Sequence, residues 1–220
     1  MAVSETHWLL DLADQHPFIR GVVGWVDLCA PDVATTLAPL AGRKKLRGIR
    51  HIVQAEPDDF MLRPDFQRGI AALAPLDLTY DILVYHRQLP AALALVERFP
   101  RQRFVVDHVA KPDIKAGLRH PWAPHMRALA GYPNVFCKAS GMVTEADWHL
   151  WSPAQLEYYL DVALEAFGPD RIMIGSDWPV CTLAADHDRT MAVVEEYVAR
   201  LPARASEAVL GGTAARFYGI

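Results

Sequence analysis

Residues 171–180 read RIMIGSDWPV. A short apolar run ends on two small residues, Gly175 and Ser176, and then on a carboxylate, Asp177. A nearly continuous apolar run of this length is typical of a strand that is buried on both faces of a parallel sheet. In parallel (β/α) folds, the residues that perform chemistry follow the carboxyl ends of such strands. The stretch therefore predicts a strand over residues 171–177 that carries Asp177 to the functional rim of a sheet.

Five further runs of the same kind precede this one along the chain. Between them lie longer segments whose apolar residues recur every three or four positions, which is the spacing of an amphipathic helix. Strand and helix alternate with no Pro/Gly/Ser-rich linker, which favours a (β/α) barrel or a doubly wound sheet in one domain over residues 1–220. The six expected strands are Gly21–Leu28, Leu46–His51, Leu78–Tyr85, Arg103–Val109, Val135–Gly141 and Arg171–Asp177.

The chain opens with a helical pattern, in which Ser4 is the expected N-cap and Trp8 is expected to point inward. A complete eight-stranded barrel takes about 250 residues, whereas this chain has 220. We therefore expect an N-terminally truncated barrel with about six of eight βα units. Its unpaired strand edges favour a homodimer, because open edges pair readily with another chain. At the other end, a short helix after Pro202 is expected to stop at Gly211-Gly212.

Composition limits the classes of function. The chain has 26 acidic and 22 basic residues, with a formal net charge of −4, whereas a nucleic-acid-binding protein needs a concentrated basic face. Its three cysteines are widely spaced and form no CxxC pair, which favours a reducing compartment. No signal-peptide pattern begins the chain, and no apolar run approaches the roughly 20 residues of a membrane span. We expect a cytoplasmic enzyme that acts on a small molecule.

Two expected strand ends carry the candidate catalytic residues. Asp177 is positioned to act as a general base toward water, and the alternative is an Asp that only caps the following turn. Trp178 beside it is expected to form an aromatic wall of the pocket. Asp107-His108 closes another strand, and one of the two should face the lumen because side chains alternate. The alternative for His108 is a buried ring bonded only to backbone.

Further polar and aromatic residues on the expected rim are candidates for substrate binding. Lys138 and Ser140 share one strand face, and a buried Lys is rare without a partner. Lys138 therefore either holds substrate oxyanions or carboxylates, or forms a structural ion pair with Asp177 or Asp107. Arg50 has a planar fork suited to a carboxylate or an oxyanion, with a rim salt bridge as the alternative. Trp25 joins this set, while Asp81 is expected to be a structural carboxylate inside the barrel.

Metal-binding patterns are sparse in this sequence. A catalytic zinc site takes about three protein ligands and leaves one position open. His108 and Asp177 are the good candidates for ligands, and no His-x-His pair occurs in the chain. We expect no metal or other cofactor, with one zinc ion as the alternative.

Several motifs together resemble one known family. The stretches GVVGWVDL (21–28), LRGIRH (46–51), FVVDHVAKP (104–112), CKASGMVTEADW (137–148) and GSDWPV (175–180) are similar to the amidohydrolase-related (amidohydrolase 2) family. Within it, the pattern resembles the branch of L-fuconolactonase-like and 2-pyrone-4,6-dicarboxylate lactonase-like enzymes. The resemblance implies a TIM-type barrel of the metal-dependent-hydrolase type that opens a sugar-acid or related lactone.

The resemblance also implies roles for individual residues. It makes Asp177 the base, His108 the histidine of the DH-x-x-KP stretch, and Lys138 and Arg50 the cationic groups. It implies that this chain holds strands three to eight, without the strand that carries the family's HxH pair. Two alternatives stay open beside lactone hydrolysis by water. One is a non-catalytic barrel remnant that self-associates or binds ligand, and the other is a zinc-dependent amidohydrolase or decarboxylase of the same superfamily.

Overall fold

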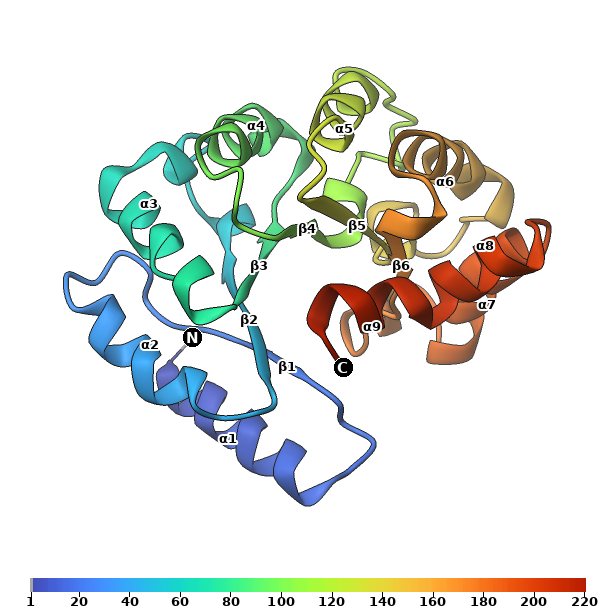
Figure 1. Cartoon of the computed structure of the whole chain (residues 1–220). Coiled ribbons are helices and arrows are strands. Elements are labelled where there is room, and N and C mark those ends of the chain that lie inside the picture. Colours follow the sequence, from blue (N-terminus) through green and yellow to red (C-terminus); the bar gives the residue numbers. More distant parts are fainter. Residues whose placement is uncertain (1) are drawn as a thin grey trace.

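A computed structural model describes residues 2–220 of the chain. Six strands form one fully parallel sheet, in which each strand pairs with its neighbours in sequence order. The sheet curves into an open arc with most helices on its outer side (Figure 1). All six expected strands are present, and the expected incomplete (β/α) barrel is confirmed. The strands are β1 (Val22–Gly24), β2 (Leu46–Ile52), β3 (Thr79–Leu83), β4 (Phe104–Val106), β5 (Val135–Ala139) and β6 (Ile172–Ile174).

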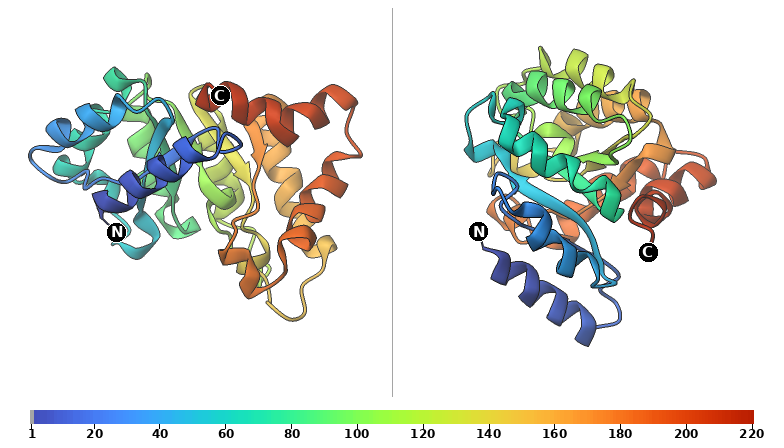
Figure 2. Two further views of the ribbon diagram at one scale, coloured as in Figure 1. Left: turned by 90° about the horizontal axis from the view of Figure 1, so that it is seen from below. Right: turned by 60° about the vertical axis from the view of Figure 1, so that its left-hand side comes forward.

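Nine α-helices are assigned within residues 2–220, and most connect one strand to the next. Figure 2 shows α1 and α2 at one end of the arc and α7 and α8 at the other. The helices are α1 (Val3–Gln15), α2 (Val33–Ala41), α3 (Pro64–Ala71), α4 (Leu89–Arg98), α5 (Trp122–Ala130), α6 (Pro153–Phe167), α7 (His187–Val198), α8 (Ala203–Glu207) and α9 (Thr213–Tyr218).

The first helix is rotated relative to the sequence-based expectation. It begins at Val3, so Ser4 lies inside it and is not its cap. Thr6 is buried against the sheet while Trp8 is 62% exposed. The hydroxyl of Thr6 explains this rotation, because it donates to the backbone oxygen of Trp25 and accepts from its N–H, both at 2.7 Å. The prediction of an inward Trp8 was therefore wrong.

The C-terminal glycine pair also behaves differently from the expectation. Helical backbone continues through Ala208–Gly212 as a π-helical turn and runs directly into α9. Thr213 is fully buried and donates its hydroxyl to the carbonyl of Pro169 at 3.0 Å. Packing of this segment against β6 outweighs the weak helix propensity of glycine, so the predicted stop at Gly211-Gly212 was wrong.

The apolar interior is divided between the two faces of the sheet. The main core lies between the strands and the outer helices, as a sheet covered by helices requires. A second, smaller cluster, formed by Val105, Met173 and Phe217, lies on the inner, lumen side. In the register of the sheet, Asp81 pairs with Val105 and Lys138 pairs with Met173. The lumen face therefore carries an apolar floor and charged groups next to it.

The arc leaves two strand edges without a strand partner among residues 2–220. β1 pairs with β2 only, and β6 pairs with β5 only. These contacts lie within one chain, so the homodimer stays a prediction. Within the described part of the chain, every helix is too short or too polar to cross a lipid bilayer.

Candidate active site

The candidate site lies at the carboxyl ends of β4, β5 and β6. β4 ends at Val106, and the backbone from His108 to Lys111 then adopts four successive left-handed conformations, with φ values of 53°, 46°, 58° and 45°. This turn breaks the alternation of the strand. As a result, Asp107 and His108 both contact lumen-facing side chains, whereas we expected only one of them to do so.

His108 joins two neighbouring strand ends. Its Nδ1 lies 2.8 Å from Ser140 Oγ, and its Nε2 lies 3.3 Å from Asp177 Oδ1. Gly141 makes this packing possible, because a Cβ built on it would lie 2.7 Å from Cγ of His108. The predicted candidates His108, Ser140 and Asp177 therefore form one contiguous group.

Burial sets the protonation of this group. It lowers the pKa of His108 to about 3, so the ring is neutral near pH 7. A neutral imidazole has one donor and one acceptor nitrogen. Both contacts are satisfied when Ser140 donates to Nδ1 and the Nε2 proton is directed at Asp177.

Asp177 has one oxygen available for a ligand. Its side chain is 11% exposed, and burial raises its pKa above the ordinary value of 3.8. Its Oδ2 is buried and has no hydrogen-bond partner among residues 2–220. Buried polar atoms are nearly always hydrogen-bonded, so this oxygen marks where a water or a substrate group would bind.

A second charged group fills the lumen below the rim. The ammonium of Lys138 lies 2.5 Å from Asp81 Oδ2 and 2.7 Å from Asp107 Oδ1, and both carboxylates are fully buried. Arg50 binds the other oxygen of Asp107 at 3.0 Å. The structure thus shows Lys138 in an ion pair with Asp107, which was one of the two expected partners, and in a second ion pair with Asp81 rather than Asp177. Asp81 lies in the barrel interior, where the sequence predicted it.

The pKa values of this second group follow its burial and its charges. Burial would lower the pKa of Lys138, but the two carboxylates outweigh it and hold the pKa well above the ordinary value of 10.5. Burial raises the pKa of Asp81, and Lys138 opposes that rise. Burial also acts on Asp107, where the positive charges of Lys138 and Arg50 prevail and hold the pKa below its ordinary value.

Arg50 and Lys138 differ in how much of each reaches solvent. The side chain of Arg50 is 40% exposed, compared with 18% for Lys138. A guanidinium has five N–H donors and an ammonium has three. Within residues 2–220, Arg50 has one hydrogen-bonded partner, Asp107. Arg50 is therefore the better placed of the two to bind a substrate oxygen.

The two predicted tryptophans do not join these contacts. Trp25 Nε1 lies 3.4 Å from His51 Nδ1, and His51 Nε2 lies 3.0 Å from Glu56, so these three form a separate polar chain. Trp178 follows Asp177 directly but is 65% exposed. Their substrate contacts stay predictions.

Sequence reasoning missed two residue sets at the site. Lys111 ends the left-handed turn and binds Glu145 at 2.8 Å, with both side chains largely buried. Its charge acts on the pKa of both His108 and Asp177. In the sequence, Lys111 stands out only as part of the DH-x-x-KP stretch, and nothing local distinguishes Glu145. Tyr218, on the last helix, reaches Asp81.

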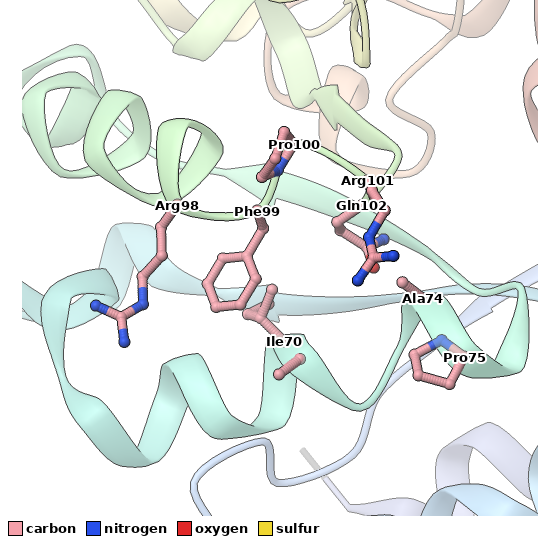
Figure 3. Close-up of a pocket in the computed structure, with 9 residues that line it drawn as sticks. Ile70, Ala74, Pro75, Arg98, Phe99, Pro100, Arg101 and Gln102 are labelled. Carbon is pink, nitrogen blue, oxygen red and sulfur yellow. The ribbon is translucent and has the colours of Figure 1, made fainter.

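One cavity lies away from this rim. It has a volume of about 620 Å³ and lies between α3, the end of α4 and the segments that lead into β3 and β4. Figure 3 shows Phe99 and Ile70 on its apolar side, with Arg98 and Arg101 flanking it. These segments precede strands, so the cavity is at the amino ends of the strands, away from His108 and Asp177.

Comparison with known proteins identifies the family. The family model described as amidohydrolase matches residues 2–220. The chain belongs to the amidohydrolase family. An L-fucono-1,5-lactonase of Burkholderia multivorans is 45% identical over 228 residues, which cover 98% of this chain and 77% of that relative. The resemblance seen in the sequence is thereby confirmed.

Solved structures agree with this family membership. A crystal structure of an amidohydrolase from Burkholderia multivorans, with bound zinc, is 44% identical and has a TM-score of 0.93, covering 100% of this chain and 80% of that one. A putative 2-pyrone-4,6-dicarboxylic acid hydrolase from Pseudomonas putida is 21% identical, with a TM-score of 0.77, over 97% of this chain and 77% of that one. The second likeness supports the fold alone.

Zinc in that relative raises the question of whether the present residues fit a metal. His108 and Asp177 approach each other, and Asp177 Oδ2 is free to bind a ligand within the described residues. A zinc centre takes about three protein donors. Residues 2–220 contain no group of three or more His, Cys, Asp or Glu side chains arranged to hold a metal ion. The described donor set therefore does not complete a zinc centre by itself.

Proposed function

We propose that this chain hydrolyses a sugar-acid lactone, with Asp177 as the general base. One observation carries the proposal: among residues 2–220, Asp177 has a buried oxygen with no hydrogen-bond partner at the carboxyl end of β6, while His108 lies beside its other oxygen. The named function of the Burkholderia relative supports L-fucono-1,5-lactone as the first substrate to test. A hydrolytic water bound to Oδ2 would lie at the rim, where substrates bind in parallel barrels.

The proposed reaction proceeds in two steps. Asp177 Oδ2 takes a proton from the water while the water oxygen bonds to the lactone carbonyl carbon, which gives a tetrahedral oxyanion. The bond between that carbon and the ring oxygen then breaks, and Asp177 returns its proton to the departing oxygen. The product is an open-chain hydroxy acid, and Asp177 ends in its starting state.

The cationic groups stabilise the negative charge of the tetrahedral intermediate. The Arg50 side chain is 40% exposed and lies against the buried Asp107. Lys138 is more buried, and its ammonium has three N–H donors for two carboxylates. Groups fixed in advance around a developing oxyanion commonly provide the largest electrostatic part of a rate enhancement. His108 stays neutral and orients Asp177. These steps involve no cofactor, and metal analysis of the active protein tests that part of the proposal.

The decisive experiment is hydrolysis of L-fucono-1,5-lactone and related aldonolactones, followed with a pH indicator and corrected for spontaneous opening. We expect wild-type turnover and at least a 10³-fold lower kcat for Asp177→Asn, since the base is essential to water activation. Asp188→Asn is the matched control, because that carboxylate is fully exposed on α7. Full activity of Asp177→Asn would overturn the role of Asp177. Absence of turnover on every lactone would overturn the proposed substrate class.

A further inference from the structure

The last helix enters the lumen from the end where the strands begin. Phe217 is 2% exposed and packs against Val105 and Met173 on the inner face of the sheet. Arg103, which directly precedes β4, holds the carbonyl of Phe217 at 2.8 Å. The C-terminus therefore lies on the inner side of the arc (Figure 1). Helix α9 forms the floor of the lumen, below the charged groups of the site.

Tyr218 connects this floor to the charged groups. Its hydroxyl donates to Asp81 Oδ2 at 2.7 Å, and the same oxygen accepts from Lys138 at 2.5 Å. The ring of Tyr218 lies 5.7 Å from the Lys138 ammonium. Lys138 in turn binds Asp107 at 2.7 Å, and Asp107 binds Arg50 at 3.0 Å. A continuous chain of contacts thus runs from the last helix to the rim.

The hydroxyl of Tyr218 has a specific effect on this chain. Asp81 Oδ2 is shared between one neutral donor and one cation. Without the neutral donor, the ammonium is the remaining donor to that oxygen, so the Asp81 carboxylate is free to turn, and Lys138 follows it away from Asp107. Charge-assisted hydrogen bonds depend strongly on donor position, so Asp107 and its partner Arg50 would also lose their fixed geometry.

The surroundings leave little else to hold Lys138 in place. A cavity of about 290 Å³ lies between β1 and α9, and its lining includes Val22, Val23, Lys138 and Tyr218. Lys138 therefore has open space on one side and depends on its two carboxylates and on Tyr218 for its position.

We propose that Tyr218 is a positioning residue of the active site: its hydroxyl orients Asp81, and through Lys138 and Asp107 it fixes Arg50 where the oxyanion forms. This inference rests on the proposed function, in which Arg50 supports the charge of the intermediate. It assigns to the final helix a part in the reaction, although within residues 2–220 no hydrogen bond or ion pair joins that helix to His108, Ser140 or Asp177.

The kinetic test compares Tyr218→Phe with wild type on the lactone, at a temperature where circular dichroism shows both fully folded. We expect kcat to fall about tenfold with KM within about twofold, a fraction of the 10²–10³ that loss of an oxyanion donor costs. Tyr197→Phe is the matched control, because Tyr197 donates to Asp161 at 2.6 Å on the protein surface. That control is expected to keep wild-type kinetics.

A double-mutant comparison distinguishes the positioning role from a merely structural one. In an Asp81→Asn background, Tyr218→Phe is expected to change kcat by less than about twofold, because residues of one network act non-additively. A tenfold loss that persists in that background would overturn the inference, as would a Tyr218→Phe variant with wild-type kcat.

A crystal structure of Tyr218→Phe tests the positioning independently of activity. We expect the Lys138–Asp107 distance to lengthen from 2.7 Å, and an unchanged network would overturn the inference. If wild type opens no lactone, the proposed function fails, and this structure still decides whether Tyr218 positions Lys138.

Discussion

Replacing Lys138 by Met removes the cation shared by two fully buried carboxylates, Asp81 and Asp107. With Arg50 included, this four-residue group carries two negative and two positive charges, so the variant leaves a net charge of −1 in the lumen. Removing one partner of a buried ion pair costs about 3–5 kcal/mol. For a chain of this size, that corresponds to roughly 6–20 °C in the unfolding midpoint.

The loss should depend on pH in a defined direction. Burial raises the pKa of Asp81, so Asp81 takes up a proton more readily than an exposed carboxyl as the pH falls. Protonated Asp81 restores a neutral group in the variant. The destabilisation is therefore expected to be largest at pH 7–8 and smaller near pH 5. Urea unfolding followed by tryptophan fluorescence at both pH values measures this difference.

Two further variants check the electrostatic reasoning. Lys138→Met combined with Asp81→Asn leaves one negative and one positive charge, so it should recover more than half of the lost free energy of unfolding. Lys115→Met breaks an exposed pair with Asp147, whose lysine side chain is 67% exposed, and should cost less than about 1 kcal/mol. A loss below 1 kcal/mol for Lys138→Met, or an equal loss at both pH values, would refute the reasoning.

Ser140→Ala should lower kcat about ten- to hundredfold through loss of the ring's orienting partner; complete loss, with an acyl-enzyme trapped in mass spectra, would instead make Ser140 a nucleophile. Gly141→Ala should lower kcat about 10²-fold, because its φ is +62° and the new Cβ would lie 2.7 Å from His108 Cγ; crystallography would show the displaced ring, and wild-type kcat would contradict this. Burial raises the pKa of Asp177, so kcat/KM should fall as the pH decreases, with an apparent pKa above the ordinary aspartate value of about 3.9. A kcat/KM that stays constant at acidic pH would exclude Asp177 as the base. Light scattering should show a homodimer that Val23→Pro, at the free edge of β1, converts to monomer; a wild-type monomer at all concentrations would contradict edge pairing.

The sheet was predictable because its strands are buried on both faces. Such strands leave continuous apolar runs in the sequence, and all six were found, although every strand except β2 is shorter than expected. The apolar periodicity of the helices was a less reliable guide to which side chains are buried. On α1, the polar Thr6 is buried because it satisfies the backbone of Trp25, which no apolar pattern records.

The sequence predicted which residues lie at the rim but only part of their geometry. His108, Ser140 and Asp177 follow strands whose carboxyl ends meet, so their proximity follows from the fold. The left-handed turn after Asp107 was not predictable, because residues such as Val109 rarely adopt positive φ. Tyr218 was also missed, because its contact joins residues 137 positions apart in the chain.

The left-handed turn has a consequence for how this protein can evolve. Each non-glycine residue in that conformation costs roughly 1–2 kcal/mol, so four in succession are a substantial fraction of a net stability that is typically about 5–15 kcal/mol. Selection for thermostability alone would favour Ala110→Gly, which relieves strain at φ 58°. The same change would loosen the backbone that carries His108. Thermostability and a fixed active-site geometry therefore make opposite demands on this turn. A substitution here that improves one is expected to impair the other.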